Sequence, residues 1–173
     1  MTSDFNSDHI MRRKFWSYLR TMIFYKLLRL KTFGVRVAVF HQGQVLLIKD
    51  RWSRLWVFPG GGIQTGESIK DAAVREFGEE TGLAMTGKTI SELKQFGEFK
   101  NISFGKNDHV YLFCADVPDV SELSPLLKKS PLNFLEVADL RWFPINDLPK
   151  TISDSTRQRI FEMKKGHPIS QIW

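Results

Sequence analysis

Three glutamates lie close together near the middle of the chain, and their spacing could support metal chemistry. Glu76, Glu79 and Glu80 stand at positions i, i+3 and i+4, so on a helix their carboxylates emerge on one side. Like charges packed this closely destabilise a helix, most of all near its C-terminus. Hard oxygen ligands suit Mg²⁺ or Mn²⁺, and a divalent cation would relieve the repulsion. The alternative is a solvated acidic helix face, which these three residues alone do not exclude.

The residues before and around these glutamates predict how they are positioned. A helix is expected over residues 68–81, because Ser68 is a favourable N-cap and Asp71 gives the start of the helix a capping-box-like pattern. Gly82 then stands where a helix commonly ends in a left-handed residue. Four apolar residues share one side of this helix and are expected to face the core: Ile69, Ala72, Ala73 and Phe77. Three consecutive glycines before the helix allow the backbone to approach a ligand closely: Gly60, Gly61 and Gly62.

The stretch from Gly61 to Leu83 resembles the Nudix box, a glycine and a glutamate followed by Arg-Glu-aliphatic-any-Glu-Glu-any-Gly-aliphatic at fixed spacing. The matching positions are Gly61, Glu67, Arg75, Glu76, Glu79, Glu80, Gly82 and Leu83. Phe77 stands where an aliphatic residue is usual, which keeps the position apolar. So full a match by chance in this chain has a probability on the order of 10⁻⁷. The wider resemblance covers about residues 34–149, and the motif is highly specific.

The resemblance implies an α/β fold, a Nudix-type α/β/α sandwich with a mixed β-sheet. Residues 34–173 are expected to form the Nudix domain, and residues 1–33 an extra basic amphipathic N-terminal helix. Hydrophobic alternation and turn residues predict the elements independently of the resemblance. The strands are expected near residues 35–39, 45–48, 56–58, 91–99, 109–116 and 140–143, with an irregular loop over 118–132 and a last helix over 153–166.

Nudix enzymes hydrolyse a nucleoside diphosphate linked to another group, so the resemblance implies a pyrophosphohydrolase that depends on Mg²⁺ or Mn²⁺. Arg75 is implied to orient the glutamates, and Glu67 to hold a metal-bound water or to support Arg75. The implied metal ligands are the Gly60 carbonyl, Glu76, Glu79, Glu80 and Glu136. The implied catalytic residues are Glu76, Glu79, Arg75 and Glu67. The general base stays open between Glu76, Glu79 and a loop glutamate such as Glu136.

The substrate is expected to be a small nucleotide, a sugar nucleotide or a dinucleotide, and the sequence does not distinguish these classes. Substrate contacts are expected from Gly61, Gly62 and Trp56. Other aromatic side chains could stack on a base or simply pack in the core or at its rim: Trp52, Phe99 and Phe104.

The charge of the chain is concentrated in its N-terminal segment. The net charge is +6, of which residues 1–33 hold +5 and residues 34–173 hold +1. The nearly neutral body gives no charge-based argument for nucleic-acid binding. Residues 10–30 contain apolar side chains at helical spacing, but Arg20 and Lys26 interrupt them and argue against a membrane-spanning helix or a secretory signal. This helix is expected to pack on the domain, to form a homodimer, or to lie on an anionic membrane surface.

The single cysteine, Cys114, lies in an apolar run and excludes an intrachain disulfide framework. A reducing compartment follows, and we expect a cytoplasmic protein with a peripheral location at the inner membrane surface as the alternative. For function, the alternative to the hydrolase is a non-catalytic Nudix-fold nucleotide sensor or scaffold. Degenerate versions of that kind usually lose a box glutamate, and all the box glutamates are present here.

Overall fold

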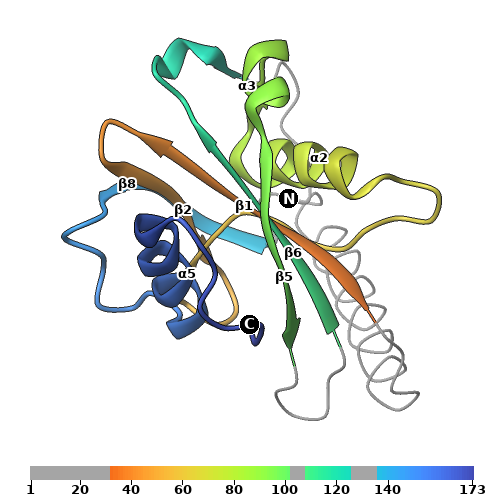
Figure 1. The fold of residues 1–173 in the computed structure, drawn as a ribbon. Helices are drawn as coiled ribbons and strands as arrows, with labels where there is room; N and C mark the ends of the chain where they lie inside the picture. Colours follow the sequence, from red (N-terminus) through yellow and green to blue (C-terminus); the bar gives the residue numbers. More distant parts are fainter. Residues whose placement is uncertain (1–31, 102–107, 126–135) are drawn as a thin grey trace, which may run out of the picture.

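The computed structural model describes residues 32–101, 108–125 and 136–173. Six strands form one sheet in the order β3-β2-β1-β6-β5, with β8 paired to β2 (Figure 1). These strands are β1 (Phe33–His41), β2 (Gln44–Asp50), β3 (Trp56–Val57), β5 (Lys94–Asn101), β6 (Asp108–Asp116) and β8 (Val137–Pro144). β1 and β6 run parallel, whereas β2 is antiparallel to its three partners and β5 is antiparallel to β6. The predicted mixed sheet is therefore confirmed.

The sheet opens between β1 and β2, and this opening positions the glycine segment. The register pairs β1 with β2 at Phe40 and His41, close to the turn that joins the two strands. Further along, β3 pairs with β2, and the chain then crosses to β1. The N–H groups of Val37 and Val35 donate to the carbonyls of Pro59 and Gly61, at 2.8 and 2.9 Å. The glycines are thereby fixed to the edge of β1 by backbone hydrogen bonds.

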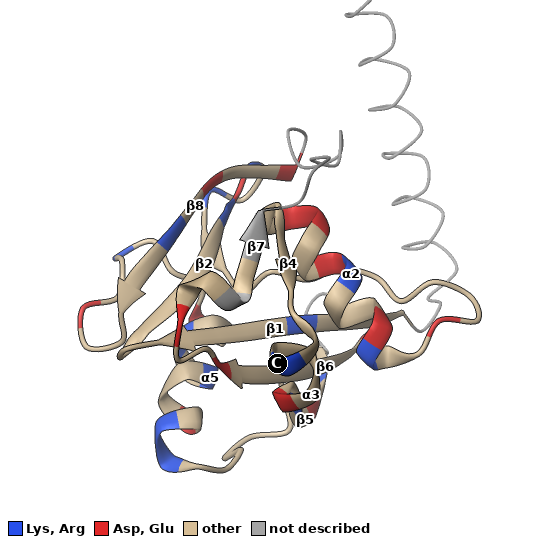
Figure 2. Ribbon diagram, turned by 90° about the horizontal axis from the view of Figure 1, so that it is seen from above, with Lys and Arg blue, Asp and Glu red and all other residues tan. Residues whose placement is uncertain are grey.

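Two helices cover the two faces of the sheet, α2 (Ile69–Thr81) and α5 (Asp154–Lys165) (Figures 1 and 2). Strand residues alternate between the two hydrophobic cores because side chains of a strand point to opposite faces in turn. Val37 packs in the core beneath α2 with Phe77, and Ala38 packs in the core beneath α5 with Ile160. The structure therefore has the three layers that were expected for the domain.

Two short elements differ from the sequence-based expectation. Residues 87–92, predicted in part as strand, form the helix α3 (Gly87–Glu92), so β5 begins only at Lys94. Thr89 is fully buried on this helix, a packing contact that hydrophobic periodicity does not reveal. Residues 118–132 were expected to be irregular, but they include a 3-10 turn (Val120–Glu122) and the strand β7 (Leu123–Pro125), which pairs with β4 (Leu83–Met85).

Some expectations fall on parts of the chain that the structure does not describe. The N-terminal helix over residues 10–30 and the second half of the 118–132 loop lie outside the described residues. Within the described residues, no helix combines the length and apolar character needed to cross a bilayer.

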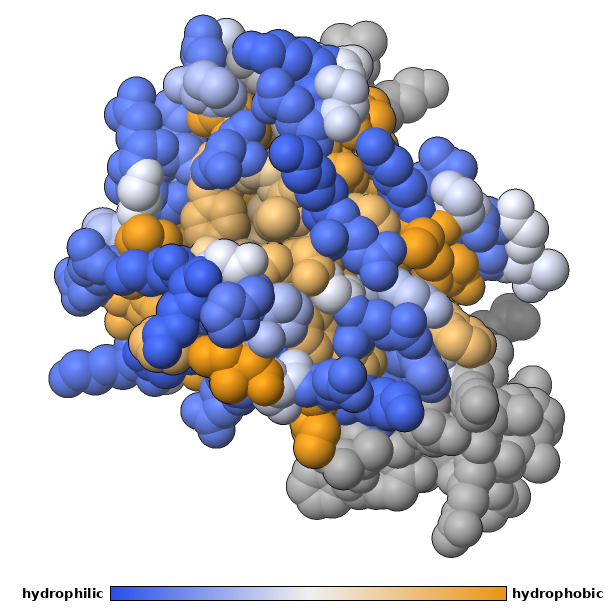
Figure 3. Space-filling model, in the orientation of Figure 1, coloured by the Kyte–Doolittle hydropathy of each residue, from blue (hydrophilic) through white to orange (hydrophobic). Residues whose placement is uncertain are grey.

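The C-terminal tail covers the outer edge of the sheet beside β5. The Lys100 N–H donates to the Gln171 carbonyl at 2.7 Å, which satisfies backbone groups that an edge strand would otherwise expose. Polar residues cover much of the face shown in Figure 3, with apolar residues exposed between them. Large exposed apolar side chains include Phe161 on α5 and, in the tail, Ile169 and Ile172.

Candidate active site

Helix α2 forms as the sequence predicts, and its two ends are fixed by capping residues. The Asp71 N–H donates to the Ser68 hydroxyl at 3.1 Å, and this hydroxyl donates to the Asp71 carboxylate at 2.6 Å. At the other end Gly82 adopts a left-handed φ of 69°, and its N–H donates to the Gly78 carbonyl. Buried Phe77 anchors the apolar side of the helix on the sheet. The acidic residues along α2 therefore lie on the sides left free (Figure 2).

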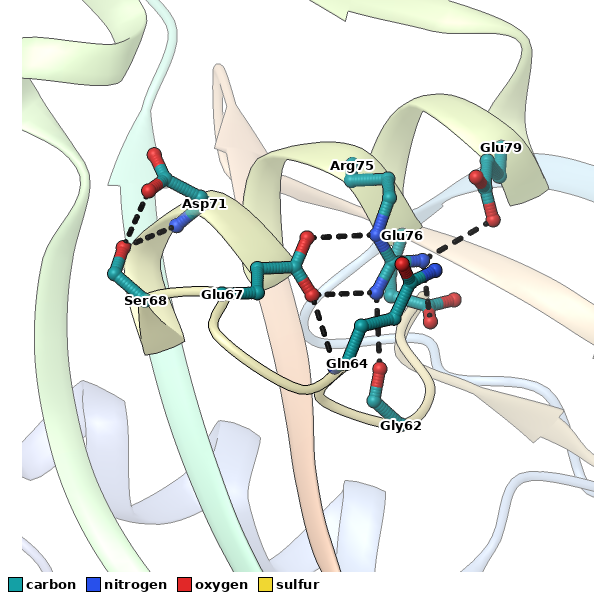
Figure 4. Close-up of polar contacts among 8 residues, drawn as sticks. All are labelled: Gly62, Gln64, Glu67, Ser68, Asp71, Arg75, Glu76 and Glu79. Carbon is teal, nitrogen blue, oxygen red and sulfur yellow. Dashed lines mark hydrogen bonds and ion pairs between the residues drawn. The ribbon is translucent and has the colours of Figure 1, made fainter.

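Arg75 is the centre of the hydrogen-bond network on α2 (Figure 4). Its guanidinium makes a bidentate pair with Glu67, with Nε–Oε1 and Nη2–Oε2 distances of 2.8 and 2.9 Å. Nη1 donates to Glu76 at 2.8 Å and to Glu79 at 3.3 Å, and Nη2 donates to the Gly62 carbonyl at 2.9 Å. One side chain thus links the glycine segment to three glutamates, as charge-assisted bonds of this type allow.

The charges of this network shift its pKa values in opposite directions. The hydrogen bonds that Arg75 donates to Glu67 lower the pKa of Glu67 and raise the pKa of Arg75. Glu76 behaves differently, because burial raises the pKa of its carboxyl and the charge of Glu79 adds to the effect, against the opposing influence of Arg75. Glu67 thus contacts Arg75 directly, and its two expected roles, support of Arg75 and hold on a metal-bound water, stay predictions.

Glu80 lies at the end of α2 that faces the glycine segment. Its carboxylate accepts a hydrogen bond of 2.6 Å from the Gly60 N–H. Burial raises the pKa of Glu80 to about 7, and the charges of Glu76 and Glu136 act in the same direction. The Arg36 charge and the Gly60 hydrogen bond oppose this shift without cancelling it. This carboxyl therefore holds its proton to a higher pH than an exposed glutamate does.

Glu136 reaches the same acidic cluster from a distant part of the sequence. It precedes β8, and its carbonyl accepts a hydrogen bond of 2.8 Å from the Arg51 N–H at the end of β2. Desolvation raises the pKa of the Glu136 carboxyl, and the charges of Glu76, Asp50 and Glu79 raise it further. The fold thus brings Glu136 close enough to the α2 glutamates for their charges to interact.

Oxygen ligands of this kind are suited to a hard divalent cation, and like charges within the cluster contribute to the raised pKa values of Glu76, Glu80 and Glu136. Among the described residues, no three acidic, histidine or cysteine side chains are grouped closely enough to hold a metal ion. Several of these oxygens are already engaged in hydrogen bonds. Arg75 holds oxygens of Glu76 and Glu79, the Gly60 N–H holds Glu80, and the Gly60 carbonyl accepts from Arg36. A cation would have to replace some of these bonds.

The three glycines differ in how much space the structure leaves for a side chain. A side chain at Gly60, where φ is +142°, would collide with the Val35 carbonyl and the Arg36 backbone. A Cβ atom at Gly61 would lie 2.5 Å from the Glu76 carboxylate, whereas at Gly62 it would meet nothing within 4 Å. Close backbone packing therefore requires glycine at Gly60, whereas a side chain at Gly61 would displace the Glu76 carboxylate. The expected substrate contacts of Gly61 and Gly62 stay predictions.

The expected substrate contact of Trp56 is wrong. Its side chain is 5% exposed and packs in the core beneath α5, edge-on to Phe143 with ring centroids 4.7 Å apart. Phe99 is also buried, and Phe104 lies outside the described residues. Trp52 is different, because it is 60% exposed on the turn between β2 and β3. The apolar run around Trp56 is too short for its sequence to show which side chains face the core.

Arg36 is a site residue that the sequence reasoning missed. It lies on β1 and donates hydrogen bonds from Nη1 to the carbonyls of Gly60 and Phe58. Its charge acts on Glu76, Glu80 and Glu136. The available signal was a lone arginine within an otherwise apolar strand, where an unpaired charge is unfavourable and calls for a partner.

Comparison with known proteins now gives the family. The NUDIX domain family model matches residues 30–163, most of the chain. The chain belongs to the Nudix family. Among its relatives, the human protein "Nucleoside diphosphate-linked moiety X motif 6" is 35% identical over 124 residues, which are 68% of this chain and 36% of that protein. The zebrafish (Danio rerio) "Oxidized purine nucleoside triphosphate hydrolase" is 34% identical over 122 residues, covering 63% of this Nudix chain and 75% of the relative.

Solved structures show the same fold. A MutT Nudix hydrolase from Burkholderia pseudomallei has a TM-score of 0.61 at 23% identity, covering 76% of this Nudix chain and 97% of that one. A bifunctional NMN adenylyltransferase/ADP ribose pyrophosphatase from Francisella tularensis, complexed with AMP and a Mn ion, has a TM-score of 0.64 at 15% identity. This match covers 96% of this chain and 50% of the Francisella chain. The chain spans about a third of the human relative's length, so the match concerns the Nudix domain.

Proposed function

We propose that this Nudix protein is a divalent-metal-dependent pyrophosphohydrolase, which cleaves the pyrophosphate of a nucleoside diphosphate linked to another group. The observation that carries the proposal is that Glu76, Glu79, Glu80 and Glu136 lie near enough to one another, beside the glycine segment, for their charges to interact. Their mutual repulsion and partial burial raise pKa values within the cluster, an arrangement more typical of a functional site than of a solvated helix face. A bound cation would relieve this repulsion, so we expect the cluster to bind one.

In this proposal the α2 glutamates, the Gly60 carbonyl and Glu136 would hold Mg²⁺ or Mn²⁺. When bound, the cation neutralises charge on the phosphate oxygens and makes water a stronger acid. Arg75 keeps Glu76 and Glu79 directed toward the cluster through its bonds at 2.8 and 3.3 Å. A carboxylate of the cluster then accepts the proton of the attacking water.

The names of the relatives support a nucleotide substrate. One relative is named for nucleoside diphosphate-linked moieties and another for oxidised purine nucleoside triphosphates, and the Francisella structure was solved with AMP and Mn. The exposed ring of Trp52 is available to such a substrate, because it follows Arg51, which contacts the backbone carbonyls of Glu136 and Val137. We assign Trp52, in place of Trp56, to stacking on the base of the substrate.

The test is hydrolysis of a panel of nucleoside triphosphates, dinucleotides and nucleotide sugars in Mg²⁺ or Mn²⁺, with products separated by chromatography. Glu79→Gln tests the cluster, and Glu92→Gln is the control, because Glu92 is an exposed glutamate on α3. We expect cleavage of one substrate class that EDTA and Glu79→Gln abolish and Glu92→Gln leaves unchanged. Nucleotide binding without turnover in either wild type or Glu79→Gln would instead favour the sensor.

A further inference from the structure

Arg36 and Arg75 approach the acidic cluster in different ways. Arg75 is committed to carboxylates, with ion pairs to Glu67, Glu76 and Glu79. Arg36 is partly buried on β1, and it donates hydrogen bonds to two backbone carbonyls, those of Phe58 and Gly60. Among the described residues, no carboxylate lies within ion-pair distance of the Arg36 guanidinium. The Arg36 charge is therefore held close to the cluster without forming an ion pair with a particular glutamate.

Hydrogen bonds through Gly60 place Arg36 beside the carboxylates, and its charge acts on them. The Arg36 charge lowers the pKa of Glu76, Glu80 and Glu136, against the effect of burial in each case. Gly60 lies between the two groups, since its N–H donates to Glu80 and its carbonyl accepts from Arg36. The guanidinium thus borders the cluster directly across the glycine segment.

This arrangement has a consequence for the cation that the cluster fits. A divalent cation at the Gly60 carbonyl would meet the positive charge of Arg36 at the same oxygen, and the two charges repel. An anionic group that lies between them would relieve this repulsion. In a pyrophosphate substrate the phosphate oxygens are that group, because each can face a cation on one side and a guanidinium on the other.

We propose that Arg36 is a substrate-binding residue, which leaves the Gly60 carbonyl when the cation binds and donates hydrogen bonds to the phosphate oxygens of the substrate. The inference deepens the proposed function and rests on it. An arginine suits this role better than a lysine, because its planar guanidinium presents several donors and can bind a phosphate in a bidentate manner. This role would explain why a charged residue, Arg36, occupies an otherwise apolar strand.

The experiment measures two affinities of the full chain, so that it does not depend on the unknown base. The first is for Mn²⁺ alone, followed by electron paramagnetic resonance. The second is for methylenediphosphonate in saturating Mn²⁺, followed by calorimetry, because this pyrophosphate analogue cannot be hydrolysed. The variants are Arg36→Met and Arg36→Lys. Arg157→Met is the matched control, since Arg157 also donates to a backbone carbonyl, that of Pro149, but lies exposed on α5.

We expect Arg36→Met to weaken diphosphonate binding at least about tenfold, the loss of one charge-assisted hydrogen bond. Its affinity for Mn²⁺ alone should be unchanged or higher, because a competitor for the Gly60 carbonyl has been removed. Arg36→Lys keeps the charge and should lose affinity for the diphosphonate by a smaller factor, and Arg157→Met should match the wild type.

Two results would overturn the inference. Unchanged diphosphonate affinity in Arg36→Met would mean that Arg36 does not contact the phosphates. A parallel loss of Mn²⁺ affinity in both Arg36 variants would make Arg36 a support for the glycine segment instead. The proposed function fails separately, through absence of hydrolysis by the wild type, and the two affinities decide the role of Arg36 even then.

Discussion

Replacement of Glu80 by glutamine should stabilise the metal-free protein at alkaline pH. In the wild type the Glu80 carboxyl is enclosed near the Gly60 N–H, and burial raises its pKa from 4.5 to about 7. Glutamine has nearly the same shape, and its carbonyl oxygen can accept the same hydrogen bond of 2.6 Å. The substitution therefore removes the buried charge and leaves the packing of α2 in place.

The direction and size of the effect follow from proton binding. Between pH 4.5 and about 7 the folded wild type holds a proton on Glu80 that the unfolded chain has released. The free energy of unfolding therefore falls as the pH rises through this interval, and it stays lower above pH 7. At about 1.4 kcal/mol for each pH unit, the difference reaches at most about 3 kcal/mol, and solvent access to this partly exposed residue reduces it.

The assay is urea-induced unfolding in EDTA at pH 5 and pH 8. Glu80→Gln should be more stable than the wild type at pH 8 and nearly equal to it at pH 5, whereas the exposed control Glu92→Gln should follow the wild type at both. Added Mg²⁺ should reverse the order at pH 8, because a cation that binds only the folded state stabilises it by mass action. Equal stabilities of wild type and Glu80→Gln at pH 8 without metal would refute the claim that the fold holds an unfavourable charge here.

Three further predictions concern the glycine segment, the two tryptophans and the metal. Gly61→Ala should displace the Glu76 carboxylate, which would lie 2.5 Å from the new Cβ, and should lower kcat/KM about 100-fold. Gly62→Ala, whose Cβ would have open space around it, should retain activity. Trp56→Ala should lower the free energy of unfolding by about 3–5 kcal/mol, since the ring is buried. Trp52→Ala should leave thermal unfolding unchanged and raise KM about tenfold in steady-state kinetics, the loss of one stacked base. Chelation should abolish hydrolysis, and titration with Mg²⁺ or Mn²⁺ should restore it; activity that survives dialysis against EDTA would contradict the metal requirement.

Local patterns were sufficient for much of the fold. Helix α2 begins at Ser68 and ends at Gly82 as predicted, because capping and a one-sided apolar pattern act within a few residues. Helix α5 is likewise capped by Ser153 and Gly166. The short helix α3 and the β4-β7 pair were not predicted, since a two-turn helix and three-residue strands carry too little periodicity to be recognised without their tertiary partners.

The sequence by itself determined the family-specific set of groups on one helix: the spacing of Glu76, Glu79 and Glu80 follows from helix geometry alone. The tertiary structure decided which distant groups join them. Glu136 arrives through the pairing of β8 with β2, and Arg36 arrives because the glycine segment pairs with β1 where β2 has diverged. It also decided that Trp56 is buried while Trp52 is exposed. Proximity across a sheet depends on strand order and register, which are set by the packing of the whole domain rather than by any local segment.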